Sequence, residues 1–207
     1  MPSVYQLKSA FSDFLRPVTN RLAAKGVSAN HVTVAAMVGS IVLAVGLYLA
    51  QIFLQSSPQM WLLVPVWMFI RMAMNNIDGM LAREHNMATP LGAILNEMGD
   101  VISDSALFLM FACLPGVNSP LLVLFTLLAI MSEMIGVVAV QIGASRRYDG
   151  PSGKSDRAVF FGLLATLYAF GVPLEGWTTW VLALINFLLL LTIFNRARAA
   201  LAELKSA

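Results

Sequence analysis

Residues 32–54 read VTVAAMVGSIVLAVGLYLAQIFL and contain no Asp, Glu, Lys or Arg. A helix needs about 20 mostly apolar residues to cross the hydrocarbon core of a bilayer, and this stretch is long enough. Further apolar segments follow it along the chain, at residues 60–82, 92–114, 120–142, 158–172 and 178–194. The sequence therefore predicts an all-α integral membrane protein with six transmembrane helices.

The composition agrees with a membrane location. Hydrophobic residues make up 58% of the chain and charged residues only 12%, whereas soluble domains are typically about 25% charged. The mean hydropathy is +0.77, which excludes a two-domain soluble protein. The single cysteine, Cys113, leaves no intrachain disulfide. The N-terminal segment lacks the apolar core of a signal peptide, so we expect none to be cleaved.

The basic residues predict the orientation. Twelve of the 13 Lys and Arg residues fall before the first apolar segment, after the second, between the fourth and fifth, or after the sixth, and the alternate connections contain none. Cytoplasmic loops collect Lys and Arg, so both termini are expected in the cytoplasm, at a bacterial inner membrane. Juxtamembrane positive charge suits anionic lipid headgroups and requires no nucleic-acid partner.

One domain is expected over residues 1–207, with an amphipathic N-terminal segment at 1–27, a six-helix bundle at 28–196 and a cytoplasmic tail at 197–207. Apolar residues recur at helical spacing in the first segment, with charged residues between them: Leu7, Phe11, Phe14, Leu15, Val18 and Leu22. Such a helix, bent at Pro17, is expected in the cytoplasmic interface. The alternative is that it packs on its own bundle.

Polar groups inside a membrane are costly and are functional candidates by default. The second and third apolar segments, with the fourth, contain Arg71, Asn75, Asp78, Asn96, Glu97, Asp100, Asp104 and Glu133. At about 1.5 Å rise per residue, Asp78 and Asp100 belong to a shallow layer open to the cytoplasm, with Asn75, Asn96 and Glu97 beside them. A deeper layer could pair Arg71 with Asp104 or Glu133. Carboxylate and amide oxygens are hard ligands, which favours Mg²⁺ or Mn²⁺.

Residues 75–100 read NNIDGMLAREHNMATPLGAILNEMGD. They resemble the signature D-x2-D-G-x2-A-R-x8-G-x3-D-x3-D of the CDP-alcohol phosphotransferase family at six of its eight positions. The matching and substituted positions are Asn75, Asp78, Gly79, Ala82, Arg83, Gly92, Asn96 and Asp100. Asn30-x2-Thr33 and Gly153-Lys154 also resemble that family.

The resemblance implies a transferase of phospholipid biosynthesis, often a homodimer. Family members pass a phospho-lipid group from a CDP-linked donor, usually CDP-diacylglycerol, to an alcohol acceptor and release CMP. By this resemblance Asp100 would be the catalytic base, and Asp78, Asp100, Asn75 and Asn96 would bind one or two metal ions. The CDP-binding positions would be Gly79, Ala82, Arg83, Gly92, Asn30 and Thr33.

The chain departs from the signature where Asn75 and Asn96 replace aspartates, which removes two negative charges. Glu97 and Asp104 could make up the deficit. Three outcomes are open: an enzyme that uses one metal ion, a two-metal enzyme with altered ligands, or a catalytically weakened relative.

The acceptor and the competing functions depend on weaker signals. Arg146, Arg147, Lys154 and Arg157 cluster between the fourth and fifth apolar segments, so we expect some of them to bind a phosphate on the acceptor. The alternative is that these residues serve only orientation and lipid contact.

Two other functions compete with that of a transferase. They are a non-catalytic CDP-lipid-binding protein and a membrane transporter or channel.

Overall fold

The computed structural model describes residues 4–55 and 57–206, with side chains from residue 10 to residue 205 except at position 56. Regular structure in these residues is entirely helical: α1 (Val4–Ala24), α2 (Ala29–Phe53), η1 (Pro58–Leu62), α3 (Leu63–Glu84), α4 (Pro90–Leu109), η2 (Met110–Cys113), α5 (Ser119–Gln141), α6 (Lys154–Ala169) and α7 (Trp177–Ser206). The predicted all-α class is confirmed. The side chains of Leu7 and Lys8, which belong to the predicted amphipathic segment, lie outside the described set.

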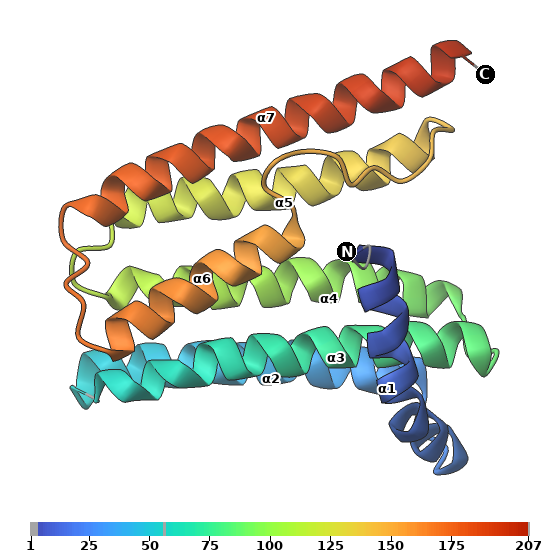
Figure 1. Cartoon of the computed structure of the whole chain (residues 1–207), viewed down its shortest axis with the longest axis horizontal. Helices are drawn as coiled ribbons and strands as arrows, with labels where there is room; N and C mark the ends of the chain where they lie inside the picture. Colours follow the sequence, from blue (N-terminus) through green and yellow to red (C-terminus); the bar gives the residue numbers. More distant parts are fainter. Residues whose placement is uncertain (1–3, 56, 207) are drawn as a thin grey trace. The chain divides into compact units, whose positions relative to one another are not determined.

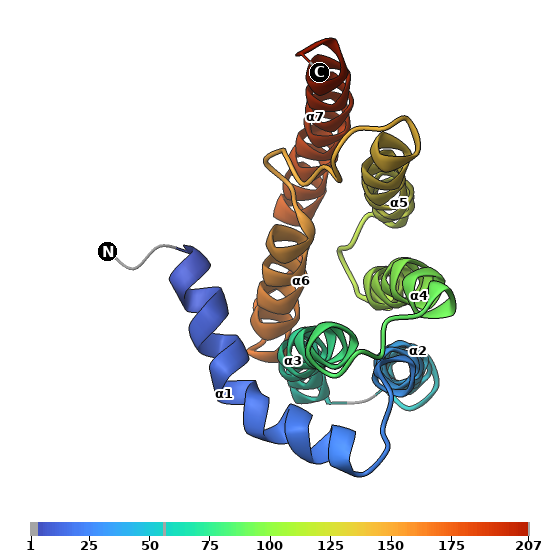
Figure 2. The same cartoon turned by 90° about the vertical axis from the view of Figure 1, so that its right-hand side faces the viewer.

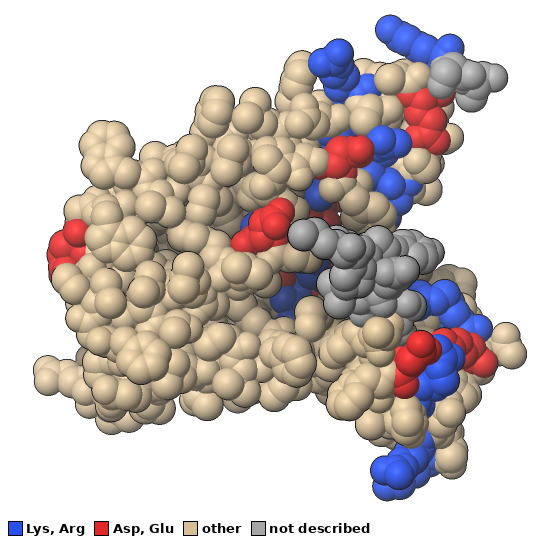
Figure 3. Space-filling model, in the orientation of Figure 1, with Lys and Arg blue, Asp and Glu red and all other residues tan. Residues whose placement is uncertain are grey.

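Four described helical segments are long and apolar enough to cross a bilayer, namely Ala29–Phe53, Pro58–Glu84, Ser119–Gln141 and Trp177–Lys205. On the face seen in Figure 3, residues other than Lys, Arg, Asp and Glu form most of the surface. The 16-residue α6 would be about 24 Å long, short of a hydrocarbon core of about 30 Å. The acidic residues of α4 lower its hydropathy. The six-span count therefore remains a prediction for these two helices.

The chain folds into two compact units, and each is built from segments distant in sequence. The first unit comprises the described residues of Met1–Val42 together with Val66–Ser103, and the second comprises those of Leu43–Pro65 together with Asp104–Ala207. The motif residues 75–100 all belong to the first unit. The basic residues between α5 and α6 belong to the second.

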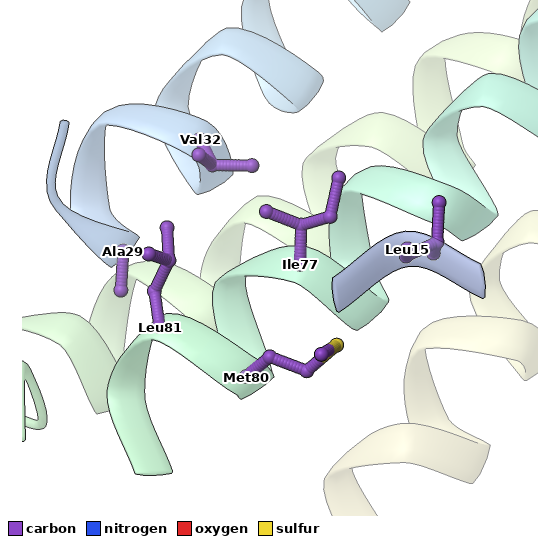
Figure 4. Packing of buried hydrophobic residues seen from close by; sticks show 6 residues of the cluster. All are labelled: Leu15, Ala29, Val32, Ile77, Met80 and Leu81. Carbon is purple, nitrogen blue, oxygen red and sulfur yellow. The ribbon is translucent and has the colours of Figure 1, made fainter. Parts of the chain in front are cut away.

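In the first unit, α1 packs on α2 and α3 through a small apolar core. This core consists of Leu15, Ala29, Val32, Ile77, Met80 and Leu81 (Figure 4). Beside this packed face, α1 presents Phe14 and Val18, which are 76% and 45% exposed. Figure 2 shows a bend midway along α1, and Pro17 lies within that helix. The helix therefore packs on its own bundle with one apolar face and leaves a second apolar face uncovered.

A close approach of α2 to α3 fixes their packing in the first unit. A Cβ at Gly39 would lie 2.2 Å from the Trp67 ring, so only glycine admits the indole at this point. The Trp67 indole N–H then donates to the hydroxyl of Ser40 at 2.9 Å. This contact pairs the polar group of the half-buried Trp67 with that of the buried Ser40, and neither group is charged.

An aromatic cluster forms the core of the second unit. Phe161 of α6 is fully buried and contacts Phe108, Phe111 and Phe125. Trp61 contacts Phe111 at a centroid distance of 5.0 Å and is fully buried as well. Trp61 begins an apolar segment, which is a usual place for an aromatic anchor in the membrane interface, but its ring packs in the protein interior. Figure 1 shows α5 and α7 side by side in the same unit, in agreement with their packing.

Candidate active site

A pocket of about 340 Å³ opens among α2, α3 and the start of α4 in the first unit. Its wall consists of Ala29, Asn30, Thr33, Asn75, Asp78, Gly79, Ala82, Arg83, Met87, Ala88, Thr89, Gly92, Ala93 and Asn96. Seven of the eight signature positions line this pocket, and so do both residues of the Asn30-x2-Thr33 pair. Asp100, the eighth position, lies outside the wall and bonds to a residue in it. The sequence motif therefore corresponds to one physical cavity.

The first turn of α2 presents two polar side chains to the pocket. Ser28 caps this helix, because its hydroxyl accepts from the backbone N–H of His31 at 3.2 Å. With Ser28 as the cap, the side chain of Asn30 lines the pocket. The Thr33 hydroxyl donates to Asp78 Oδ2 at 2.8 Å. This bond fixes the Asp78 carboxylate, which is 5% exposed.

The pocket face of α3 combines an acidic group, a bare turn and a basic group. Asp78 and Gly79 are followed one turn later by Ala82 and Arg83, so all four line the cavity. A Cβ at Gly79 would lie 3.1 Å from Arg83 Nη1, and its absence lets the guanidinium lie close to the helix. The Arg83 side chain is exposed. A planar fork of donors at the mouth of a pocket is suited to a phosphate group.

The first turn of α4 forms the third wall. The Thr89 hydroxyl accepts from the backbone N–H of Gly92 at 2.9 Å, and Pro90 occupies the first helical position. Glycine is needed at position 92, because a Cβ there would lie 2.7 Å from Asn30 Oδ1 and 3.0 Å from Thr89 Oγ1. The positive end of the helix dipole is thus exposed at the pocket, which favours an anionic ligand.

Asp100 lies on α4 and is bonded to α3. Its Oδ1 accepts from Arg71 Nη2 at 3.0 Å and from Asn75 Nδ2 at 3.1 Å. Arg71 also donates to the backbone carbonyl of Asp100 at 3.3 Å. The Arg71 side chain is 9% exposed and that of Asp100 is 28% exposed. Arg71 was expected to pair in a deeper layer, and the structure gives it Asp100 as a partner.

The pocket offers oxygen donors of the kind that bind a divalent cation. Asp78, Asn75 and Asn96 line the cavity, and Asp100 adjoins it through Asn75. Within residues 4–55 and 57–206, no group of three or more His, Cys, Asp or Glu side chains could hold a metal ion. Two carboxylates and two amide carbonyls fit one hard cation, but they supply half the charge of a four-aspartate set.

Glu97 is half-buried on α4 and is not part of the pocket wall. Asp104 belongs to the second unit, where Arg157 Nη2 lies 3.9 Å from its Oδ2. Both residues were expected as candidate replacements for the missing aspartates. The pairing with Arg157 gives Asp104 a local electrostatic role of its own.

A buried ionic cluster in the second unit is centred on Glu133 of α5. Arg157 donates to Glu133 at 2.7 Å, and Arg196 lies 3.5 Å from the same oxygen. Arg157 and Arg196 are 1% and 2% exposed. Arg157 also donates to the Ser132 hydroxyl at 3.1 Å. Arg157 is thus buried and bonded to protein groups, whereas a basic residue on an open loop would have its donors in water.

The other three predicted acceptor residues lie nearer the surface of the second unit. Arg147 bonds to Asp149 at 2.8 Å and to Glu203 at 2.8 Å. Its hydrogen bonds hold the pKa of Asp149 below the ordinary value for aspartate. Arg146 lies 3.8 Å from Glu133, and Lys154 is the first residue of α6. All four basic residues therefore lie in one unit.

Several wall residues were not singled out from the sequence, namely Ala29, Met87, Ala88, Thr89 and Ala93. Thr89 could have been found, because Thr-Pro before an apolar run is a helix-start signal. The alanines and the methionine carry no chemical signal of their own.

Comparisons with known proteins identify the family of the chain. Residues 27–193 match the CDP-alcohol phosphatidyltransferase family. The chain is 44% identical over 199 residues to the inner membrane protein YnbA of Escherichia coli (strain K12), covering 96% of each. It is 28% identical over 214 residues to the phosphatidylinositol phosphate synthase of Mycolicibacterium smegmatis, covering 97% of this chain and 91% of the relative.

The fold is shared with solved structures. The phosphatidylinositol phosphate synthase of Mycobacterium tuberculosis, solved with CDP-DAG bound, aligns with a TM-score of 0.69 at 22% identity, over 89% of this chain and 92% of that chain. The same synthase, solved with manganese and citrate, aligns with a TM-score of 0.69 over 89% of this chain and 87% of that one. Together with the pocket lined by the signature residues, the family match shows that the chain belongs to the CDP-alcohol phosphatidyltransferase family.

Proposed function

We propose that this chain is a phospholipid-synthesising transferase. It moves a phosphatidyl group from a CDP-linked donor such as CDP-diacylglycerol to the hydroxyl of an alcohol acceptor and releases CMP. The observation that carries the proposal is the pocket itself, because a single cavity is lined by seven of the eight signature positions. A relative is named a phosphatidylinositol phosphate synthase, and a solved synthase of the same fold holds CDP-DAG.

The donor's pyrophosphate fits the polar end of the pocket. Arg83 supplies a fork of donors at the mouth, and the first turn of α4 supplies the positive end of a helix dipole. Asn30 and Thr33 supply side-chain bonds from the opposite wall. Gly79 and Gly92 leave the space in which the side chains of Arg83 and Asn30 lie against the helices, and the small Ala82 keeps the wall beside them open. In this proposal these residues orient the donor, and the acyl chains extend into the membrane.

The chemistry is a substitution at phosphorus. The acceptor oxygen attacks the lipid-side phosphorus, the bond from that phosphorus to CMP breaks, and CMP leaves with the electron pair. Asp100 takes the proton of the acceptor hydroxyl. Arg71 and Asn75 position Asp100 through its Oδ1. Positioning of this kind supplies much of the catalysis in phosphoryl transfer.

Mg²⁺ or Mn²⁺ is the proposed cofactor, and its candidate ligands are the pocket residues Asp78, Asn75 and Asn96, with Asp100 beside them. A divalent ion there would neutralise charge on the pyrophosphate and stabilise the leaving group. The synthase of the same fold that was solved with manganese supports the choice of ion. Glu97 and Asp104 remain proposed contributors only if the four residues prove insufficient.

The acceptor is proposed to carry its own anionic group. Lys154, Arg146, Arg147 and Arg157 lie in one unit and are rich in donors for phosphate. Lys154→Ala tests this point, because it removes a charge at the first turn of α6 and leaves the direct contact of Arg157 with Glu133 in place. We expect the KM for a phosphorylated acceptor to rise several-fold and the KM for the donor to stay constant. Equal kinetics with phosphorylated acceptors would leave orientation and lipid contact as the role of Lys154.

The membrane arrangement is also part of the proposal. Six spans, cytoplasmic termini and a pocket open to the cytoplasm follow from the distribution of Lys and Arg. The relative named as an inner membrane protein supports a bacterial inner membrane. The uncovered apolar face of α1 at Phe14 and Val18 suits the lipid interface, and a homodimer is the expected assembly.

A second function has an observation in its favour. Asn75 bonds to Asp100 instead of opposing it with a second carboxylate, and this suits a protein that binds CDP-lipid without turnover. The deciding experiment is CMP release from CDP-diacylglycerol by purified protein in detergent, with pooled polyol, amino-alcohol and phosphorylated acceptors. We expect release that requires the acceptor and Mg²⁺ or Mn²⁺, and that disappears in Asp100→Asn. CDP-lipid binding without any release would favour the non-catalytic function.

A further inference from the structure

Opposite charges balance at the candidate active site. Asp78 and Arg83 line the same pocket with opposite charge, and Asp100 is ion-paired with Arg71 at 3.0 Å. These four residues together carry no net formal charge. A site for two divalent ions has to offset four positive charges, which usually takes several carboxylates.

The contacts of Asp100 show which groups offset the charge of its carboxylate. Asn75 can donate an N–H to Asp100 because it is an amide, whereas an aspartate at position 75 can only accept. Two carboxylates at this separation repel each other unless a cation or a proton lies between them. The Asn75 amide and the Arg71 guanidinium supply donors where the four-aspartate signature would need a cation.

We propose that this site takes a single divalent cation, and that Arg71 together with Asn75 replaces a second cation at Asp100. The cation is assigned to the side of Asp78, whose carboxylate is oriented by Thr33 and lies with Asn96 in the pocket wall. This inference rests on the proposed function for the identity of the site, but it concerns only the number of ions.

One carboxylate and neutral amides bind a divalent cation weakly by themselves. The anionic pyrophosphate of the donor adds the missing charge, so the cation enters together with it. Mn²⁺ affinity is therefore expected to increase at least tenfold in the presence of CDP, the soluble probe for the donor's head. Changes in the ligands and their immediate partners alter metal affinity by about 10–100-fold in proteins, which sets this scale.

The test is Mn²⁺ binding to the purified full-length chain, measured by electron paramagnetic resonance of free Mn²⁺ with and without CDP. The wild type is expected to bind one Mn²⁺ per chain when CDP is present, and Asn75→Asp with Asn96→Asp is expected to bind two. Asn76→Asp is the matched control. It makes the same chemical change one residue along α3, where the side chain bonds to Ser12 and not to the pocket, so its stoichiometry should stay at one.

Two Mn²⁺ per wild-type chain, or none with CDP present, would overturn the proposal. Asn96→Asp alone is the second variant, because position 96 has no part in the Arg71–Asp100 contact and its substitution does not disturb that pair. Failure of the proposed function is separable, since it would appear as absent CMP release with the one-ion stoichiometry intact. Conversely, CMP release accompanied by two bound ions would leave the function standing and reject the inference.

Discussion

The hydrogen bond from Thr33 to Asp78 provides a sharp test of the site. Thr33→Val keeps the branched shape of the side chain and removes the hydroxyl that donates to Asp78 Oδ2 at 2.8 Å. The same hydroxyl lies 3.1 Å from the Ala29 carbonyl, but one proton serves one acceptor at a time, and the carboxylate is both nearer and charged. The substitution therefore removes the donor that orients the Asp78 carboxylate.

The magnitude follows from the type of bond. A hydrogen bond to a charged group contributes about 1.5–3 kcal/mol, which corresponds to roughly 10- to 150-fold in a rate or binding constant. Thr33 is half-buried, and water can replace part of the lost bond, so we expect the lower end of this range. kcat/KM for CMP release should fall about tenfold.

Thr19→Val is the matched control for this experiment. The Thr19 hydroxyl is fully buried on α1 and donates to the Leu15 carbonyl of its own helix at 3.1 Å. Both variants should unfold within a few degrees of the wild type in detergent, while only Thr33→Val should lose activity. If kcat/KM of Thr33→Val stays within twofold of Thr19→Val, the Thr33–Asp78 bond has no part in the reaction and this reasoning is refuted.

Two further substitutions probe the pocket wall and the second unit. Gly92→Ala should raise the KM for the CDP-linked donor several-fold, because the new Cβ would lie 2.7 Å from Asn30 Oδ1 and displace that side chain; steady-state kinetics of CMP release measures it. Glu133→Ala should destabilise the protein by about 3 kcal/mol, because it removes the nearest carboxylate from the buried Arg157 and leaves only Asp104, at 3.9 Å; thermal unfolding in detergent measures it.

Each of these two substitutions has a matched control at another position of the chain. A Cβ at Gly46 of α2 would meet no atom within 4 Å, so Gly46→Ala should leave the donor KM unchanged. Met134 follows Glu133 and is 63% exposed, so Met134→Ala should change the unfolding temperature little. An unchanged donor KM in Gly92→Ala, or an unfolding temperature of Glu133→Ala equal to that of Met134→Ala, would contradict the respective argument.

The helices were predictable from the sequence to the extent that burial in lipid or protein demands apolar residues. The segment at 120–142 corresponds to α5, Ser119–Gln141. The segment at 178–194 gives only the first part of α7, which continues to Ser206 because RARAALAELK consists largely of strong helix formers. Hydropathy marks where a chain is apolar, and a helix can continue into polar sequence.

The polar face of α3 was predictable from residue spacing, whereas the CDP-binding positions on α2 and α4 were predicted only through the resemblance to the family signature. The partner of Arg71 was not predictable, because spacing fixes only the face of α3 on which a side chain lies. Which carboxylate Arg71 meets depends on the rotation and axial offset of α4, and these follow from packing contacts such as Gly99 against Thr33.

The role of Asn75 is interpreted differently from the sequence and from its contacts in the structure. In the sequence it is a lost ligand, because an amide replaces a charged oxygen at a signature position. In the structure its N–H group bonds to Asp100 beside Arg71, and a carboxylate there would instead face a carboxylate. The substitution thus removes the repulsion that a cation would otherwise have to offset, and Asp100 stays available in a site of lower charge. A chain that had merely lost its chemistry would have no need of Arg71 in this position, since a buried arginine is costly unless it has a charge to balance.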